Sequence, residues 1–369
     1  MDNFKRLESL DTLRGIDMLF LMGLEGFILS IGRLFPGGDD WWFVEQTSHV
    51  AWNGFHIEDL IFPLFLFIAG ISFPFSYAKQ CRKGASRSQI YLKIFRRGLL
   101  LVLLGLVCNG LLRFNWGSLR ICSVLGRIGM AWMFAALLFI NFKPRTRAMI
   151  AAALLVGYRL LLLIPAPDVP GADPLSREGN IVGYIDHLIL GASHIYANGS
   201  YDPEGILSTI PAVVTAMLGM FTGEFVKSPE EKMSGNRKTL WMFGAAAVML
   251  VLGIVWNHWF PVNKKLWTSS FVLVAGGVSL ILFALMYWIV DVRGWRKWTF
   301  PFRVVGMNSI TIFLAPRLIS FSQAKNFLLG GIIDHCPDAI GSVISSAGYM
   351  AVIWLFLYFL YRKKIFLRV

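Results

Sequence analysis

Titratable side chains gather in one short segment, SHVAWNGFHIEDLIFPLFLFIAG, which runs from Ser48 to Gly70. Two of its residues, His49 and Asp59, lie on the polar side of a strongly apolar run. Histidine is the usual base near neutral pH, so proton transfer is the chemistry that such a residue supplies most readily. Ionisable groups at the rim of a membrane span are costly to hold there and usually have a function. The segment therefore predicts a titratable site near one face of a bilayer.

The composition favours a membrane protein. Hydrophobic residues make up 56% of the 369 residues, charged residues only 15%, and the mean hydropathy is +0.60. A soluble globular chain carries about 25% charged residues. The sequence has no Walker A loop, no dinucleotide-binding glycine pattern and no HExxH motif, so nucleotide hydrolysis and zinc peptidase activity have no support. The four cysteines show no CxxC spacing, and we expect neither a disulfide framework nor a metal site.

The chain is expected to be all-α and to cross the membrane about ten times. A spanning helix needs about 20 mostly apolar residues. The segments that satisfy this requirement are 15–35, 60–78, 97–113, 121–141, 147–165, 206–226, 239–260, 267–290, 302–322 and 340–361. An even number of spans places both termini on the same side of the membrane.

The distribution of basic residues predicts the orientation. Loops on the side of the termini hold 25 of the 35 Lys and Arg residues, and the opposite loops hold 8. Because cytoplasmic loops carry the excess of Lys and Arg, both termini are expected in the cytoplasm. The net charge of +13 then reflects topology, and no nucleic-acid partner is needed to explain it.

The two long early loops on the opposite side, 36–59 and 166–205, are rich in acids and histidines. An acidic outer surface suits a cationic or amine-bearing ligand, although ordinary solvated outer loops are often acidic too. The loop 166–205 is long enough to expect a function for it, and within it the segment 183–190 has the apolar spacing of a short interfacial helix. No repeat or linker is evident, so we expect a single transmembrane domain over residues 1–369.

Three charged residues deep in the predicted spans need an explanation. Asp17 and Glu25 lie eight residues apart in the first span, roughly two helical turns, and so on similar faces. Glu25, near mid-membrane, should face a cavity, be paired or be protonated. Arg127, in the fourth span, offers a planar fork for phosphate or carboxylate, and the alternative is a structural ion pair.

Long motifs run through the whole chain: SLDTLRGIDM (9–18), HVAWNGFHIEDLIFPLFLFIAG (49–70), VLGRIG (124–129), GYIDHLILG (183–191), YDPEGILSTIPAV (201–213), FPVNKKLWTSSFVL (260–273) and GMNSI (306–310). In length and order they resemble the heparan-alpha-glucosaminide N-acetyltransferase family, including its bacterial relatives. The resemblance implies the catalytic core, without the luminal domain and leading span of the animal lysosomal members.

The activity that this resemblance implies is transfer of an acetyl group from cytoplasmic acetyl-CoA, the co-substrate, across the bilayer to the amine of a glucosamine-containing saccharide. The family's active-site histidine falls on His49, which would deprotonate the attacking ammonium or carry the acetyl group as a covalent intermediate. The family usually has Asn at the position of Glu25. Glu25 is therefore expected to be protonated, to act as a base or ammonium anchor, or to mark a different substrate.

Further site residues follow from the resemblance by position. Those expected to hold the amine and hydroxyls of the sugar, or to line its cavity, are Asp59, Asn53, Asp186, Asp202, Glu204 and Lys264. Asp186 could equally cap its short helix. Those expected at acetyl-CoA are Arg14, Arg127, Asn308 and Asn263. Arginine suits this role because it binds phosphate bidentately.

Two other functions remain open at this point. An amino-sugar transporter also carries charged residues inside its spans, and broken helices or inverted repeats would favour it. A non-catalytic partner in an envelope assembly is supported only by Glu25, which departs from the Asn that the family usually has at this position. The expected location is the bacterial inner membrane, with membrane lipid around a multi-pass chain, and the family resemblance suggests a homodimer.

Overall fold

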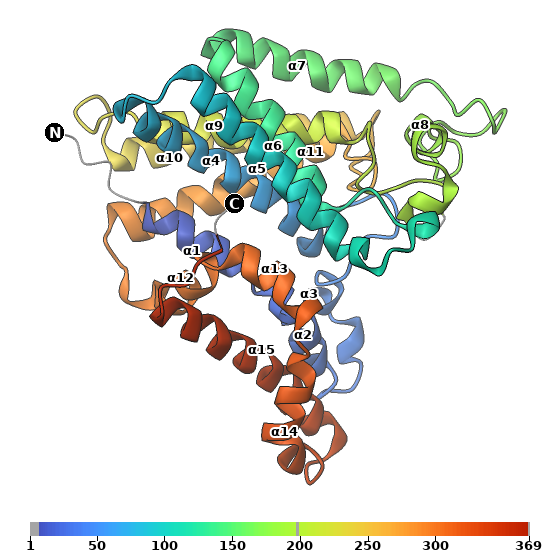
Figure 1. Cartoon of the computed structure of the whole chain (residues 1–369), viewed down its shortest axis with the longest axis vertical. Helices are drawn as coiled ribbons and strands as arrows, with labels where there is room; N and C mark the ends of the chain where they lie inside the picture. Colours follow the sequence, from blue (N-terminus) through green and yellow to red (C-terminus); the bar gives the residue numbers. More distant parts are fainter. Residues whose placement is uncertain (1–6, 197–198, 368–369) are drawn as a thin grey trace. The chain divides into compact units, whose positions relative to one another are not determined.

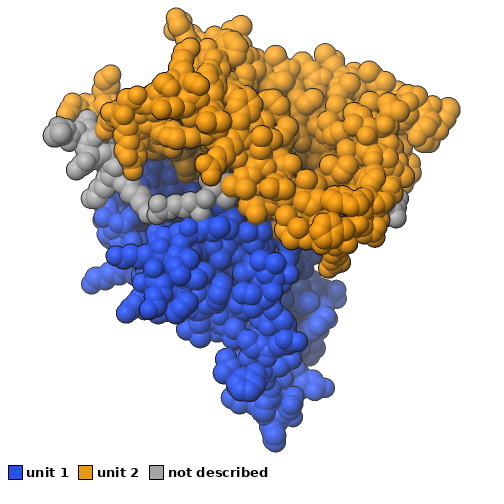
Figure 2. Space-filling model, viewed as in Figure 1, with its two compact units in different colours: residues 1–50, 56–61, 282–368 blue, residues 51–55, 62–281, 369 orange. Residues whose placement is uncertain are grey.

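The computed structural model describes residues 7–196 and 199–367, and these residues form helices, turns and loops without a strand. The expected all-α class is therefore confirmed for the described chain. The chain divides into two compact units, coloured in Figure 2. Unit 1 contains residues 1–50, 56–61 and 282–368, and unit 2 contains residues 51–55, 62–281 and 369. The single domain expected over the whole chain stays a prediction.

Unit 1 combines the first and last parts of the sequence (Figure 1). Its helices are α1 (Glu8–Asp17), α2 (Leu24–Gly32), α3 (Trp42–Glu45), α12 (Phe300–Gly306), α13 (Ser309–Leu318), α14 (Phe321–Ile333) and α15 (Asp338–Arg362). Its shorter turns are η1 (Phe20–Met22), η2 (Gly38–Asp40), η3 (Ile57–Leu60), η8 (Tyr287–Val292) and η9 (Lys297–Thr299).

Unit 2 is formed by the middle of the sequence. Its helices are α4 (Ile61–Arg82), α5 (Arg87–Cys108), α6 (Val124–Asn141), α7 (Pro144–Leu161), α8 (Ile181–Leu190), α9 (Thr209–Val226), α10 (Gly235–Asn257) and α11 (Ser269–Met286). The first residue of α4 and the last five residues of α11 belong to unit 1. Its 3₁₀ turns are η4 (Leu111–Arg113), η5 (Trp116–Ser118) and η6 (Ala192–His194). The short helix expected over 183–190 is α8, so that prediction is confirmed.

Six helical segments in the described chain are long and apolar enough to cross a membrane, by length and composition. They are Ile57–Arg82, Val124–Asn141, Thr209–Val226, Gly235–Asn257, Ser269–Val292 and Asp338–Arg362. Two of the other expected spans, 97–113 and 147–165, fall largely on α5 and α7. The last two, 15–35 and 302–322, are each divided among shorter helices. A polytopic membrane protein is therefore supported, and the number of ten spans stays a prediction.

The first expected span is not one helix. Helix α1 ends at Asp17, the turn η1 follows, and α2 begins only at Leu24. Gly23, between them, has a φ of 97°, a left-handed conformation that glycine adopts without a steric penalty. The expectation that Asp17 and Glu25 share a helical face is therefore wrong. Asp17 is 3% exposed, whereas Glu25 is on the exposed surface.

Within unit 1, α1 crosses α12 with the two backbones in contact. A Cβ atom at Gly15 would overlap the carbonyl oxygen of Phe302, and one at Gly306 would overlap the carbonyl oxygen of Asp11. Small residues at a crossing allow this approach between helices in apolar surroundings. The contact therefore positions α1 against α12, with Gly15 on the contacting face.

The N-terminus of α1 is held by charges from the last part of the chain. The Asp291 carboxylate accepts hydrogen bonds from the backbone N–H groups of Glu8 and Ser9, both at 3.3 Å. Arg303 Nη1 donates to Glu8 Oε2 at 3.0 Å. A carboxylate at the first turn satisfies backbone donors that lack partners in the helix and complements the helix dipole.

Helices α4 and α9 form the centre of unit 2. In each, 67% of the most apolar stretch is buried, against 22% for α10. A Cβ atom at Gly70 would overlap the carbonyl oxygen of Ala216, and one at Gly219 would overlap that of Phe67. The same close approach of small residues therefore fixes α4, whose N-terminal end follows the His49 segment.

We expect Gly306→Ala to lower the apparent melting midpoint of the protein in detergent, because its Cβ atom has no room against the backbone of α1. Overpacking of this kind costs about 1–3 kcal/mol. Gly26→Ala is the matched control, since nothing lies within 4 Å of a Cβ atom at that helical position of the same unit. Equal midpoints for the two variants would contradict the described crossing.

Candidate functional site

His49 and Asp59 form a hydrogen-bonded pair in unit 1. His49 Nδ1 lies 3.0 Å from Asp59 Oδ1. The Asp59 side chain is 3% exposed and that of His49 is 55% exposed. The pair therefore joins a buried carboxylate to an imidazole that solvent reaches.

The backbone around Asp59 determines its orientation. Asp59 lies in the turn η3, immediately before α4. Its Oδ2 atom accepts hydrogen bonds from the backbone N–H of His56 at 3.2 Å and of Val50 at 3.4 Å. One carboxylate thus connects the two ends of the segment from residue 49 to residue 59.

Two further hydrogen bonds fix the same loop. His56 Nδ1 lies 2.9 Å from the carbonyl oxygen of Ser48, and the N–H of Glu58 donates to the carbonyl oxygen of Gln46 at 3.1 Å. The residue before His49 is held by the second histidine of the segment. His56 is therefore placed to support the loop.

This geometry suits proton transfer by His49. When the neutral ring donates through Nδ1 to Asp59, Nε2 carries the lone pair that accepts a proton. The carboxylate also stabilises the imidazolium that forms, as in other histidines oriented by an acid. Sequence reasoning placed Asp59 at the sugar, and the structure gives it the position of an orienting partner to His49.

The other predicted site residues of unit 1 have different surroundings. Arg14 lies 3.6 Å from Asp11, an ion pair within α1. Asn308 is 1% exposed and donates through Nδ2 to the carbonyl oxygen of Val304 at 2.9 Å. Glu25 is exposed, whereas Asp17, to which sequence reasoning gave no role, is buried.

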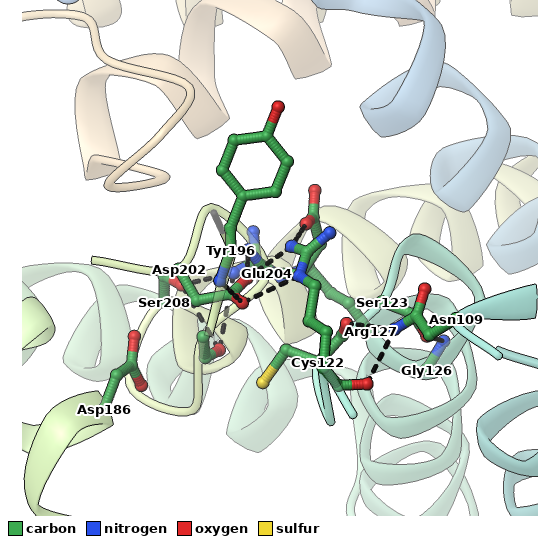
Figure 3. A network of polar contacts seen from close by, with 12 residues as sticks. Asn109, Cys122, Ser123, Gly126, Arg127, Asp186, Tyr196, Asp202, Glu204 and Ser208 are labelled. Atoms are coloured by element: carbon green, nitrogen blue, oxygen red, sulfur yellow. Dashed lines mark hydrogen bonds and ion pairs between the residues drawn. The ribbon is translucent and has the colours of Figure 1, made fainter. Parts of the chain in front are cut away.

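In unit 2, Arg120 binds Asp202 and Glu204. Figure 3 labels these two acids and the residues around them. Arg120 donates to both oxygens of Asp202, at 2.6 and 2.9 Å, and to Glu204. Its guanidinium lies 4.7 Å from the ring centre of Tyr196. Burial lowers the pKa of Arg120, but the two carboxylates outweigh this effect and leave the pKa above its ordinary value. The predicted role of these acids at the sugar is untested, and their contacts favour a structural role.

Backbone groups complete the coordination of Asp202, which is fully buried. Its Oδ2 atom accepts from the N–H of Tyr196, and its Oδ1 atom from the N–H of Glu204, both at 2.9 Å. Asn109 Nδ2 donates to the carbonyl oxygens of Arg120 and Cys122 at 2.9 and 2.8 Å. The network therefore ties the end of the 166–205 loop to the segment before α6.

Arg127 is 2% exposed at the first turn of α6. It donates to the hydroxyl of Ser208 and, at 3.4 Å, to the carbonyl oxygen of Gly205. Its guanidinium lies 5.0 Å from the ring centre of Trp267, a cation–π contact. These partners directly follow the expected outer loop, which favours an anchoring role over a contact with the phosphates of a cytoplasmic cofactor.

Two predicted residues that are far apart in sequence meet in unit 2. Asn263 Nδ2 donates to Asn53 Oδ1 at 3.0 Å, and Gly54 N donates to the carbonyl oxygen of Val262 at 2.8 Å. Asn263 is 1% exposed and accepts a bond from the N–H of Leu266. The pair joins the segment after His49 to the loop before α11, where Lys264 also lies. Their predicted roles at ligands remain untested.

Sequence reasoning missed Arg120 as the partner of Asp202 and Glu204. Arg120 was counted only among the basic residues of the outer loops, and its pairing with Asp202 spans 82 positions. No local spacing signals such a contact. Asp17 was noted as an acid inside an apolar stretch, but it was given no role.

The apolar helices support a multi-pass membrane protein, and the hydrogen-bonded His49 and Asp59 form its candidate site. Residues 6–117 match a family model described as "Domain of unknown function (DUF5009)". The chain is 29% identical over 419 aligned residues to heparan-alpha-glucosaminide N-acetyltransferase of Homo sapiens, and 27% identical to that of Mus musculus. Each alignment covers 99% of this chain and 60% of the relative.

The chain is therefore homologous to heparan-alpha-glucosaminide N-acetyltransferase, which confirms the resemblance of its motifs. It spans about 60% of the length of the curated relatives that it matches. Two helices of unit 1 are broken, a feature that transporters share, but the comparisons give the transporter alternative no support.

Asp186 gives a pH-dependent prediction for the loop network. Burial raises the pKa of Asp186 to about 6, although the hydrogen bond from the N–H of Ile206 lowers it. Because this pKa exceeds the unfolded value of roughly 3.9, the protonated form stabilises the fold at low pH, and the contribution is lost as the pH rises through about 6.

Asp186→Asn keeps an acceptor for Ile206 and removes the titration. We expect its melting midpoint to exceed that of the wild type above about pH 7, by the equivalent of about 1–3 kcal/mol, and to lose this advantage near about pH 4. Asp168→Asn, at an exposed position of the same loop, serves as the control. A variant less stable than the wild type at every pH would contradict the expectation.

Proposed function

We propose that this protein is a transmembrane N-acetyltransferase. It moves acetyl from cytoplasmic acetyl-CoA to the amine of a glucosamine-type sugar on the opposite side of the membrane. Homology to two acetyltransferases named for a glucosaminide supports this proposal. Ten spans, cytoplasmic termini and a bacterial inner-membrane location complete it, in agreement with the excess of basic residues on one side.

The observation that carries the proposal is the bond between His49 and the buried Asp59. An amine attacks a thioester only after it loses a proton from its ammonium form. His49 Nε2 takes that proton, and Asp59 holds the ring and stabilises the imidazolium. The N–C bond of the amide then forms as the C–S bond of acetyl-CoA breaks, and the thiolate takes the second amine proton.

A covalent route uses the same pair differently. His49 Nε2 attacks the acetyl carbonyl, CoA leaves, and the amine then accepts the acetyl group from the imidazole. The exposed ring of His49 suits either route. The two routes differ in one respect, because only the covalent route leaves acetyl on the protein when the amine is withheld.

The remaining residues take supporting roles in this proposal. Arg14, Asn308, Asn263 and Arg127 are proposed for acetyl-CoA, although the contacts of Arg127 with Gly205 and Ser208 assign it first to anchoring the loop. Asn53, Lys264, Asp186, Asp202 and Glu204 are proposed for the sugar or for the loops beside it. Because Arg120 binds both Asp202 and Glu204, we assign these two acids to shaping the loop first. A homodimer is part of the proposal on the family resemblance alone.

We expect His49→Ala to reduce the rate of acetyl transfer from labelled acetyl-CoA to glucosamine about 10²- to 10⁴-fold, the usual worth of a general base. Purified protein in detergent is the material for the assay. Asp59→Asn should reduce kcat in the same direction with a smaller change in KM, because it acts through the ring of His49. His335→Ala, an exposed histidine of unit 1, is the matched control.

Wild-type rates in His49→Ala would exclude the assigned base. A wild-type protein that binds acetyl-CoA and acetylates no amino sugar would show that the acceptor class is wrong. A wild-type protein that fails to bind acetyl-CoA would remove the enzyme proposal, and uptake of labelled glucosamine would then be the experiment to run.

A further inference from the structure

An apolar groove in unit 2 has no part in the proposed reaction. Its volume is about 370 Å³, and side chains of α6, α7 and α9 line it. Phe134 of α6, which is 44% exposed, lies on one wall, Leu154 of α7 on the other, and Val213 of α9, which is 6% exposed, at the floor. All three helices belong to one unit, and α7 runs along the edge of that unit in Figure 1.

The lining of the groove is apolar along most of its length. Among the described residues that line it, the polar side chain is Asn141. Its Oδ1 atom accepts a hydrogen bond from the hydroxyl of Tyr91 at 2.7 Å, and its Nδ2 atom donates to the carbonyl oxygen of Leu137 at 2.8 Å. A sugar or a nucleotide would lose hydrogen bonds to water here and gain few in return. The groove therefore suits a hydrocarbon chain.

Contacts at the two ends of α6 show how it lies against α9. Arg127, in the first turn of α6, donates to Ser208, which directly precedes α9. At the other end, the guanidinium of Arg147 lies 4.2 Å from the ring centre of Phe139 and binds Glu224 of α9 at 2.7 Å. Helices α6 and α9 therefore run side by side in the same direction.

The groove follows these two helices over more than the depth of one leaflet. It reaches from Phe142, just after α6, to Ile210, two residues after Ser208. Because Ser208 is level with Arg127, this corresponds to about 13 residues of α6, or roughly 20 Å at 1.5 Å per residue. One leaflet contributes about 15 Å, half of the roughly 30 Å hydrocarbon core. An acyl chain that enters beside Phe142 can therefore lie in the groove along its whole length.

The cross-section of the groove suits one hydrocarbon chain better than a helix. Its volume divided by its length gives roughly 20 Å², whereas a helix about 10 Å across needs roughly 80 Å². A helix of a second copy would therefore rest on the rim and leave the floor at Val213 uncovered. A single acyl chain reaches that floor.

Basic residues lie at the end of the groove that Phe142 marks. Lys143 and Arg145 follow it directly, and both are exposed. Lys143 is the N-cap residue of α7 and makes no side-chain cap, so the N–H groups of the first helical turn add positive character there. This loop is expected on the cytoplasmic side, where the leaflet carries anionic lipids. The charge at this end therefore complements an anionic headgroup.

We propose that the groove between α6 and α7 binds an anionic phospholipid, with one acyl chain along the groove and the headgroup phosphate at Lys143 and Arg145. The apolar lining holds the chain, and the two basic side chains select the headgroup. The bound chain packs between the two helices, so the lipid stabilises unit 2. The inference does not depend on the proposed acetyltransferase function.

Two lipids with the same acyl chains, phosphatidylglycerol and phosphatidylcholine, test the headgroup. The purified full-length chain is delipidated in detergent, and bound lipid is measured by native mass spectrometry over a titration. We expect phosphatidylglycerol to bind about 5- to 30-fold more tightly, the usual effect of one or two basic residues near an anionic lipid. Replacing both Lys143→Gln and Arg145→Gln should remove this preference and leave phosphatidylcholine binding unchanged. Lys83→Gln with Arg87→Gln, an exposed basic pair of unit 2 on the same predicted side, is the matched control.

A side chain that fills the groove tests the position of the acyl chain. Leu154→Trp should weaken the binding of both lipids at least about 10-fold, since each methylene displaced from apolar surroundings changes the affinity about 4-fold. Val156→Trp, at an exposed position of α7 outside the groove, is the matched control. Phosphatidylglycerol should raise the melting midpoint of the wild type and of Val156→Trp, and not that of Leu154→Trp. If Leu154→Trp does not fold, Ile150→Trp in the lining contributed by α7 takes its place.

Equal binding of the two lipids to the wild type, or an unchanged preference after both basic residues are replaced, would overturn the inference. Undiminished lipid binding in the groove variant would place the lipid elsewhere and overturn it as well. If that variant keeps its lipid and changes from dimer to monomer, the groove is an interface between copies of the chain and the lipid site is excluded.

Discussion

The candidate site depends on one buried carboxylate, Asp59. Its two oxygens bind the ring of His49 and the backbone N–H groups of Val50 and His56. The same residue lies in the first turn of the helical segment Ile57–Arg82, which continues as α4, and Gly70 of α4 packs on the backbone of α9. Loss of this carboxylate would leave the histidine without orientation and the loop without its central acceptor. The position of the His49 ring is therefore set by a carboxylate that is almost fully buried.

The buried acids of the two units differ in the hydrogen-bond donors around them. In unit 2, Arg120 and backbone donors satisfy Asp202, and the carboxylate gains from a closed network. In unit 1, the carboxylate of Asp17 has no donor among the described residues. A satisfied network rigidifies a structure, whereas a buried carboxyl without donors destabilises it. Proteins tend to tolerate such groups at functional positions. This contrast separates the acids that shape the loop in unit 2 from a buried acid without donors in unit 1.

Composition and hydropathy were sufficient for the fold class and for the approximate positions of most helices. They did not predict where a helix is interrupted, because an apolar stretch has the same hydropathy whether it forms one helix or two. Gly23 and the turn η1 divide the first expected span, and this break separates Asp17 from Glu25. Glu25 is exposed near the start of α2, and its expected catalytic role stays a prediction.

For the site, the sequence indicated His49 and Asp59 because both lie in one motif. The sequence did not predict the pairings between segments that are far apart along the chain. Asn53 with Asn263 and Arg120 with Asp202 join positions 210 and 82 residues apart. Both partners of the first pair were singled out, although nothing in the sequence said that they meet. The contact with Arg120 favours a structural role for Asp202, and its predicted role at the sugar stays a prediction.

The most direct test of the central claim separates the two substrates by a membrane. Protein reconstituted into vesicles receives labelled acetyl-CoA outside and glucosamine inside, and the sugar inside is analysed. The account predicts labelled N-acetylglucosamine in the lumen with wild-type protein inserted with its termini outward, and none with His49→Ala. Export of unmodified glucosamine, or acetylation only when both substrates share one side, would contradict it.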